Sequence, residues 1–218
     1  MSFLADRFRS AGVSTLGSLF VVQVFFGFLG FVELVNAAPK EVVLIRHADK
    51  WPFESHSTSL SPTGYMRAVA FAYYFIDRFG EPDLLIATDP EHPHSSSIRE
   101  LQTLAPLASL LAKENPSSRA SAILHRYRSD QTEKLASDLL QDDRYNGKKL
   151  VICWHHKSMK HLAKVLGVKK EVRKWPVENF DDVWVLQYGA DGELESFTQL
   201  EDQYPMSEKT WESILESR

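Results

Sequence analysis

The sequence predicts an α/β protein, with a three-layer fold in which helices cover both faces of a mainly parallel sheet. Short apolar runs of strand length alternate along the chain with longer segments whose apolar residues recur at helical spacing. Several of these runs have no polar position in their middle, as expected for strands that helices bury on both faces. Together, the two observations favour parallel strands that are joined by helices.

The expected elements begin and end at recognisable residues. The run Val42-Val43-Leu44-Ile45 is the first strand. Ser61 followed by Pro62 is typical of a helix start, and Gly80 of a helix end. The turn at 189–192 joins the last two strands. In chain order, we expect strands at 42–45, 83–87, 121–126, 150–154, 183–186 and 195–197, and helices at 65–79, 98–113, 133–140 and 159–166.

The composition is that of one globular domain. The chain has 218 residues, a hydrophobic content of 44% and a formal net charge of -4. Its basic residues are scattered, with one modest cluster at 169–174 that we interpret as a solvated surface, so no nucleic-acid partner is expected. Cys153 is the single cysteine, so no intrachain disulfide can form and a cysteine-based zinc site is not expected.

Residues 1–38 differ from the rest of the chain. Arg7 and Arg9 precede a long apolar stretch, which small residues follow. This order is typical of a secretory signal peptide. However, the stretch approaches the ~20 residues that span a bilayer, so membrane attachment through residues 13–35 is the alternative. Either interpretation places the body, residues 39–218, outside the cytoplasm, as a secreted, periplasmic or membrane-anchored protein.

Basic side chains follow three of the predicted strands. Arg46 and His47 come directly after the first strand, Arg99 lies at the start of the helix after the second, and His155-His156 follow the strand at 150–154. Because parallel strands end at the same edge of a sheet, we expect these side chains to meet there. Arginine presents a planar fork of donors to phosphate oxygens, so the sequence predicts an anion site. No metal ion or cofactor is expected.

Four segments, in order, resemble the histidine phosphatase superfamily, also called phosphoglycerate mutase-like. Arg46-His47-Ala48 is similar to its Arg-His-Gly element, with alanine in place of glycine, and Leu60 to Gly64 with Arg67-Ala68 is similar to its second element. Ser95 to Thr103 contains its Ser-x-x-x-Arg-x-x-Gln-Thr pattern, and Val151 to His156 stands where its second histidine belongs. The resemblance covers about residues 42–200 and implies a histidine phosphatase domain over 39–218.

The resemblance implies a metal-independent phosphatase that hydrolyses a phosphomonoester through a phosphohistidine on His47. Arg46, Arg99 and a second histidine would hold the phosphoryl oxygens. Counting forward from the strand favours His156 as that histidine, which we prefer, whereas counting back from Met159 and Gly167 favours His155.

Other parts of this hypothesis have several candidates. Asp130 is a candidate for the acid that protonates the leaving group, with Glu133 and Asp49 as further candidates. The substrate would be a phosphorylated small molecule or a phosphoprotein. A phosphoglycerate mutase-type phosphotransferase and a non-catalytic phospholigand-binding protein of the same fold are the alternative functions.

Overall fold

A computed structural model describes residues 37–52, 56–90, 97–201 and 203. Their centre is a six-stranded sheet with the strand order β3-β2-β4-β1-β5-β6. The first four strands in this order are mutually parallel, and β5 is antiparallel to both β1 and β6. The strands are β1 (Glu41–Ile45), β2 (Leu84–Thr88), β3 (Ile123–Tyr127), β4 (Lys149–Cys153), β5 (Val183–Tyr188) and β6 (Leu194–Leu200). The predicted mainly parallel sheet is therefore confirmed.

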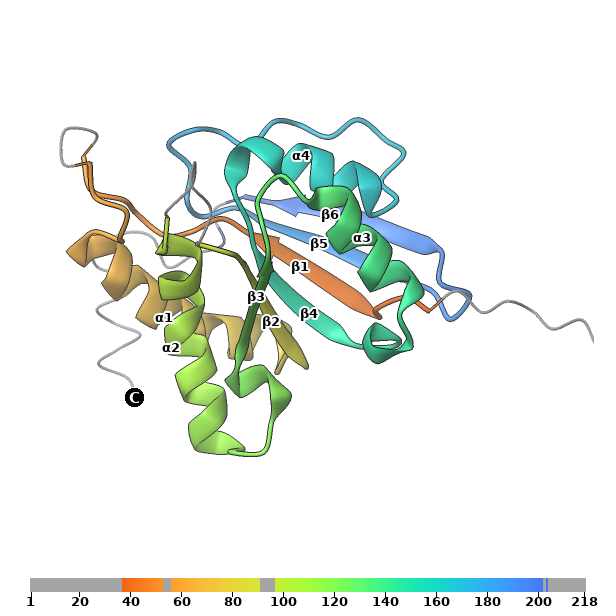
Figure 1. Cartoon of the computed structure of the whole chain (residues 1–218), viewed down its shortest axis with the longest axis horizontal. Coiled ribbons are helices and arrows are strands. Elements are labelled where there is room, and N and C mark those ends of the chain that lie inside the picture. Colours follow the sequence, from red (N-terminus) through yellow and green to blue (C-terminus); the bar gives the residue numbers. More distant parts are fainter. Residues whose placement is uncertain (1–36, 53–55, 91–96, 202, 204–218) are drawn as a thin grey trace, which may run out of the picture. The chain divides into compact units, whose positions relative to one another are not determined.

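Helices cover both faces of this sheet, as Figure 1 shows. Helices α1 and α2 lie on one face and α3 and α4 on the other. The helices are α1 (Pro62–Phe79), α2 (Arg99–Glu114), α3 (Thr132–Gln141) and α4 (His156–Val165), with short 3-10 turns η2 (Arg119–Ser121) and η3 (Asp143–Tyr145). The predicted three-layer α/β class is confirmed.

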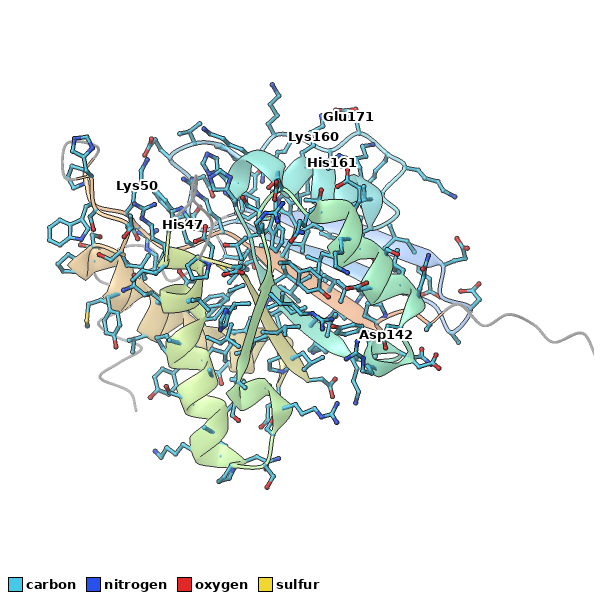
Figure 2. The ribbon with its side chains drawn as sticks, viewed as in Figure 1. His47, Lys50, Asp142, Lys160, His161 and Glu171 are labelled. Atoms are coloured by element: carbon cyan, nitrogen blue, oxygen red, sulfur yellow. The ribbon has the colours of Figure 1, made fainter. Side chains whose placement is uncertain are left out.

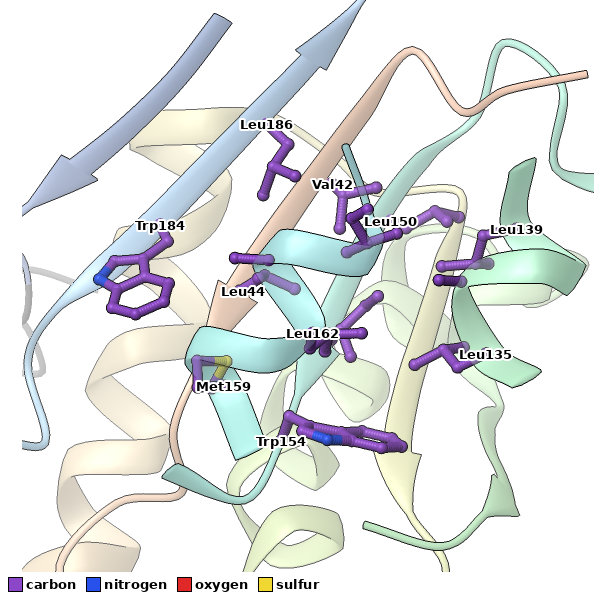
Figure 3. Packing of buried hydrophobic residues seen from close by; sticks show 14 of the residues in the cluster. Val42, Leu44, Leu135, Leu139, Leu150, Trp154, Met159, Leu162, Trp184 and Leu186 are labelled. Carbon is purple, nitrogen blue, oxygen red and sulfur yellow. The ribbon is translucent and has the colours of Figure 1, made fainter. Parts of the chain in front are cut away.

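The apolar run of β1 divides between two cores. Val42 and Leu44 belong to the cluster under α3 and α4, whereas Val43 and Ile45 belong to the cluster under α1 and α2. Figure 3 shows the first cluster, with Met159 and Leu162 of α4 facing β1 and β4. Successive strand residues point to opposite faces, so burial on both faces explains why the run has no polar position.

Most predicted elements are confirmed, with boundaries moved by a few residues. Helix α1 begins at Pro62, where Ser61 Oγ accepts a hydrogen bond of 3.0 Å from the backbone N–H of Gly64. Helix α4 was expected from Met159 but begins at His156, and His155 is its N-cap residue. The tandem histidines therefore lie at a helix start and not in a loop.

The predicted signal peptide or anchor covers residues 1–38, of which 1–36, including the apolar stretch 13–35, lie outside the described residues. Among the helices of the described residues, none is long and apolar enough to cross a membrane. Ala38 already packs in the body, because it is buried and its carbonyl accepts a 2.8 Å hydrogen bond from the backbone N–H of Gly147. The division at residue 38 and the location outside the cytoplasm stay predictions.

Candidate active site

The candidate site lies where β1, β2 and β4 end. Ile45 of β1 and Ala87 of β2 are both in register with Cys153 of β4. Beyond these ends, the backbone N–H of Trp154 donates a 2.9 Å hydrogen bond to the carbonyl of Ile45. Figure 2 shows His47 and Lys50 past the arrowhead of β1, whereas Asp142 lies toward the other end of that strand. This arrangement is the predicted edge of the sheet.

Arg46 is buried, with 1% of its surface exposed. Its Nη1 donates hydrogen bonds to the carbonyls of Pro176 (3.3 Å), Val177 and Asn179 (2.9 Å). Its guanidinium carbon lies 4.3 Å from the centre of the Phe180 ring. Burial lowers the pKa of Arg46 to about 10, so the side chain remains charged at neutral pH. Its Nε is also buried and meets no hydrogen-bond acceptor among the described residues, which leaves this atom for an anion.

His47 is held as a neutral base. It is 3% exposed, and its Nδ1 lies 2.7 Å from the carbonyl oxygen of its neighbour Ala48. A carbonyl only accepts, so Nδ1 carries the proton and Nε2 keeps a lone pair. Burial, reinforced by the charges of Arg46 and Arg99, lowers the pKa of His47 to about 3 against the opposing effect of the Ala48 hydrogen bond. An imidazole in this state is a nucleophile at neutral pH.

Arg99 is the first residue of α2 and lies against the segment before α1. Its Nε donates a 3.2 Å hydrogen bond to the carbonyl of Ser59, and its Nη2 donates to the carbonyl of Ser57. Burial lowers the pKa of Arg99. Its charge acts on both Arg46 and His47, since it contributes to lowering the pKa of each. Both predicted arginines therefore lie near enough to the predicted histidine for their charges to act on it.

Thr103, the last residue of the third motif, joins α2 to the segment after β1. Its Oγ1 accepts a 2.9 Å hydrogen bond from the backbone N–H of Ala48 and donates one of 2.8 Å to the carbonyl of Arg99. The preceding Gln102 accepts a 2.7 Å hydrogen bond from the backbone N–H of Leu60 through its Oε1. These bonds explain why glutamine and threonine follow Arg99 at this spacing.

Gly64, in the second motif, allows close packing of α1 on the same segment. A Cβ atom at this position would lie 2.1 Å from the carbonyl oxygen of Asp49, so only glycine fits. The same carbonyl accepts a 3.0 Å hydrogen bond from the backbone N–H of Ser61. The carboxylate of Asp49 pairs with Nε of Arg67 at 2.8 Å, so this acid candidate has a structural partner.

The tandem histidines differ in their charged neighbours. Burial lowers the pKa of His155, as do the charges of Lys157, Arg46 and Arg99, and His155 in turn contributes to lowering the pKa of His47. Burial lowers the pKa of His156 to about 3, together with the charges of Arg46, His155, Lys157 and Lys50. Both rings are partly exposed, with centroids 4.8 Å apart. The charge of Arg46 acts on both rings, so the choice between His156, which the sequence favoured, and its alternative His155 stays a prediction.

Asp130 and Glu133, the other predicted acid candidates, are exposed and engaged elsewhere. Asp130 is 63% exposed and pairs with Nε of Arg128 at 3.2 Å. Glu133 is 66% exposed and lies 2.6 Å from Nε2 of His161. The pairing partners of these carboxylates are not site residues. The assignment of Asp130 as the acid stays a prediction.

The sequence analysis did not identify two residues of the site, Glu100 and Phe180. Glu100 is 1% exposed, accepts a 3.0 Å hydrogen bond from Oγ of Ser97, and has its pKa raised by burial. An acidic residue in the first turn of a helix is ordinary, so it drew no attention. The sequence feature that could have identified Glu100 is its position on the buried face of α2, which it shares with Thr103 and Leu104. Phe180 was missed as well, because it lies in a segment without periodicity.

In the described part of the chain, no three histidine, cysteine, aspartate or glutamate side chains gather as metal ligands. The largest described cavity, of about 650 Å³, lies elsewhere, between the ends of α3 and α4 and the β5–β6 hairpin. The candidate site is therefore defined by its buried side chains and their bonds.

No protein-family model and no curated protein matches the sequence. The chain is similar to solved structures, among them the protein histidine phosphatase SixA complexed with tungstate (14% identity, 74% of this chain and 97% of that chain, TM-score 0.49). Another is a SixA protein from Agrobacterium tumefaciens, with 17% identity over 73% of this chain and 97% of that chain and a TM-score of 0.42. A third is a mycobacterial glucosyl-3-phosphoglycerate phosphatase with inorganic phosphate, with 15% identity over 75% of this chain and 99% of that chain and a TM-score of 0.43.

These similar structures belong to the histidine phosphatase superfamily, the family that the sequence motifs resemble. The three-layer α/β class rests on the sheet order and the two helical layers of this chain itself. At such identities and TM-scores, the matches carry no argument about activity.

Proposed function

We propose that the chain is a histidine phosphatase, which hydrolyses a phosphomonoester without a metal ion through a phosphohistidine on His47. One observation carries the proposal. His47 is buried and neutral, its Nδ1 is fixed by the Ala48 carbonyl, and the charges of Arg46 and Arg99 act on it. A nucleophile between two cations suits an anionic phosphate ester, because the cations attract the substrate and stabilise the charge of the transition state.

In the first step, the Nε2 lone pair of His47 attacks phosphorus. The N–P bond forms while the P–O bond to the leaving group breaks, and the leaving oxygen takes a proton from a general acid, the role for which Asp130 is the candidate. Nδ1 keeps its proton, so the phosphorylated ring is positively charged and the Ala48 carbonyl stabilises it. Arg46, Arg99 and His155 would hold the three remaining phosphoryl oxygens.

In the second step, water attacks the phosphohistidine. The oxygen of water bonds to phosphorus, the N–P bond breaks, and its electron pair returns to Nε2 of His47. The water gives its proton to the group that acted as the acid in the first step, and inorganic phosphate is released. The enzyme is then in its starting state, with Nδ1 still protonated, so no resident cofactor is required.

A phosphorylated histidine within a protein is a second candidate substrate. Ester hydrolysis benefits from an acid that protonates the leaving oxygen, and Asp130 and Glu133 are exposed and paired with Arg128 and His161. A P–N bond depends less on such an acid, because an imidazole leaving group takes up a proton readily near neutral pH.

The proposal is tested by assaying the full chain on an aryl phosphate, with and without EDTA, beside His47→Asn. Asparagine retains a group that can donate to the Ala48 carbonyl but has no nucleophilic nitrogen. We expect hydrolysis that EDTA does not reduce and that the substitution lowers by about 10³-fold or more. Quenching with labelled substrate should leave phosphate on the parent protein and none on His47→Asn.

Other results would favour the alternatives. Transfer of the phosphoryl group to a sugar-acid acceptor in preference to water would indicate a phosphoglycerate mutase-type enzyme. Binding of inorganic phosphate without turnover of aryl phosphate or of a phosphohistidine peptide would indicate a phospholigand-binding protein. Faster turnover of the phosphohistidine peptide than of the aryl ester would favour the second candidate substrate.

A further inference from the structure

The segment 173–182, between α4 and β5, lies against Arg46, although it is distant from it in sequence. We call this segment the strap. Three of its carbonyls, those of Pro176, Val177 and Asn179, accept hydrogen bonds from the single atom Nη1 of Arg46. Since these bonds occupy one end of the guanidinium, the strap determines which edge of the fork remains for a ligand.

The strap is braced by its own side chains. Trp175 donates a 3.0 Å hydrogen bond from Nε1 to the carbonyl of Asn179, and the side chain of Asn179 accepts hydrogen bonds from the backbone N–H groups of Asp181 (3.2 Å) and Asp182 (3.1 Å). Asp182 is fully buried and pairs with Arg173. The backbone of the strap is therefore held in place by groups other than the site residues.

Phe180 is the residue of the strap whose side chain contacts both Arg46 and His47. Its ring centre lies 4.3 Å from the guanidinium carbon of Arg46 and 5.7 Å from the centre of the His47 ring. Phe180 is 9% exposed, so water does not compete strongly with these contacts. A guanidinium stacked on an aromatic face has a restricted plane, and the neighbouring imidazole has less room to turn.

We propose that Phe180 is a positioning residue, which sets the plane of Arg46 and limits the rotation of His47 so that both meet one phosphoryl group. Phe180 itself takes no part in bond making. The inference rests on the proposed phosphatase function. It assigns to the strap a role in preorganising the site, and preorganised donors contribute more to catalysis than donors that must first reorient.

Phe180→Leu tests the proposal, because leucine fills much of the space without offering an aromatic face. Phe197→Leu is the matched control, since Phe197 is equally buried at 6% exposure and lies 5.3 Å from Nζ of Lys170, on β6 outside the site. We expect similar losses of thermal stability in the two variants. Only Phe180→Leu should lower kcat, by about 10-fold, and weaken the affinity for inorganic phosphate. Phe180→Tyr should restore both values to within about twofold of the parent.

Calorimetric titration with inorganic phosphate separates this inference from the proposed function. If the parent chain hydrolyses no phosphoester, the phosphatase proposal fails, and a selective loss of phosphate affinity in Phe180→Leu would still support the positioning of Arg46. If the parent is active and Phe180→Leu behaves like Phe197→Leu in both kcat and affinity, Phe180 is structural and the inference is wrong. Failure of Phe180→Tyr to restore the parent values would overturn it as well.

Discussion

The ends of β1 and β4 are neighbours in the sheet, yet they present their basic residues differently. After Ile45, the side chains of Arg46 and His47 are buried at 1% and 3% exposure, and hydrogen bonds to backbone carbonyls fix both. After Cys153, the buried Trp154 is followed by His155 and His156, which are partly exposed at the start of α4. Among the described residues, the buried Nδ1 of His156 has no hydrogen-bond partner.

The difference indicates that His47, after β1, is fixed before the substrate binds, whereas the tandem histidines after β4 can still change orientation. The nucleophile must have its lone pair aimed before the substrate arrives, and the β1 end provides this because His47 is buried and its Nδ1 is bonded to the Ala48 carbonyl. A histidine that holds a phosphoryl oxygen can settle after binding, because its donor is needed only in the complex. We infer that the β1 end supplies the nucleophile and the β4 end closes on the substrate.

The largest expected effect concerns the choice between the tandem histidines. We expect His155→Ala to lower kcat/KM by about 10²-fold or more, as the loss of one positioned donor to the transition state does. His156→Ala should lower it by less than about fivefold, because His155 is the tandem histidine whose charge acts on His47. Steady-state kinetics on one aryl phosphate decides between them. A larger loss of kcat/KM in His156→Ala than in His155→Ala would show that His156, the residue that the sequence favoured, holds the phosphoryl oxygen.

The burial of His47 should make folding sensitive to acid. Its folded-state pKa is about 3, below the ordinary value of 6.5. Between these values, the unfolded chain binds a proton that the folded chain does not, so stability falls as the pH decreases from about 6.5 toward 3. The expected loss between pH 7.5 and pH 5 is about 2 kcal/mol for this group.

Denaturant unfolding at the two pH values measures this loss. His47→Gln should lose less stability than the parent on acidification, whereas His161→Gln, at a side chain 53% exposed on α4, should behave like the parent. Equal acid sensitivity in all three proteins would show that His47 is not buried in its neutral form.

The smallest effect is expected at the exposed carboxylates. Asp130→Asn and Glu133→Gln should each change kcat/KM by less than about twofold, because these side chains are exposed and paired with Arg128 and His161. Substrates with increasingly poor leaving groups are the sensitive probe. A loss in Asp130→Asn that grows as the leaving group becomes poorer would identify Asp130 as the acid after all.

The local pattern of the sequence determined the layers of the fold and the part of the candidate site that Arg46, His47 and Arg99 form. The apolar run before Arg46 predicts a strand buried on both faces, and the strand ends predict that Arg46, His47 and Arg99 meet. Such conclusions follow from periodicity and from the common direction of parallel strands, which are properties of short segments.

Tertiary structure alone decided the parts of the site that depend on distant segments. The strap reaches Arg46 across about 130 residues of sequence, so neither its carbonyls nor Phe180 could be assigned in advance. The neutral state of His47 and the burial of Glu100 likewise depend on solvent exclusion and on charges from other elements. Burial and electrostatic interaction are set by the packed molecule, and no local pattern of residues encodes them.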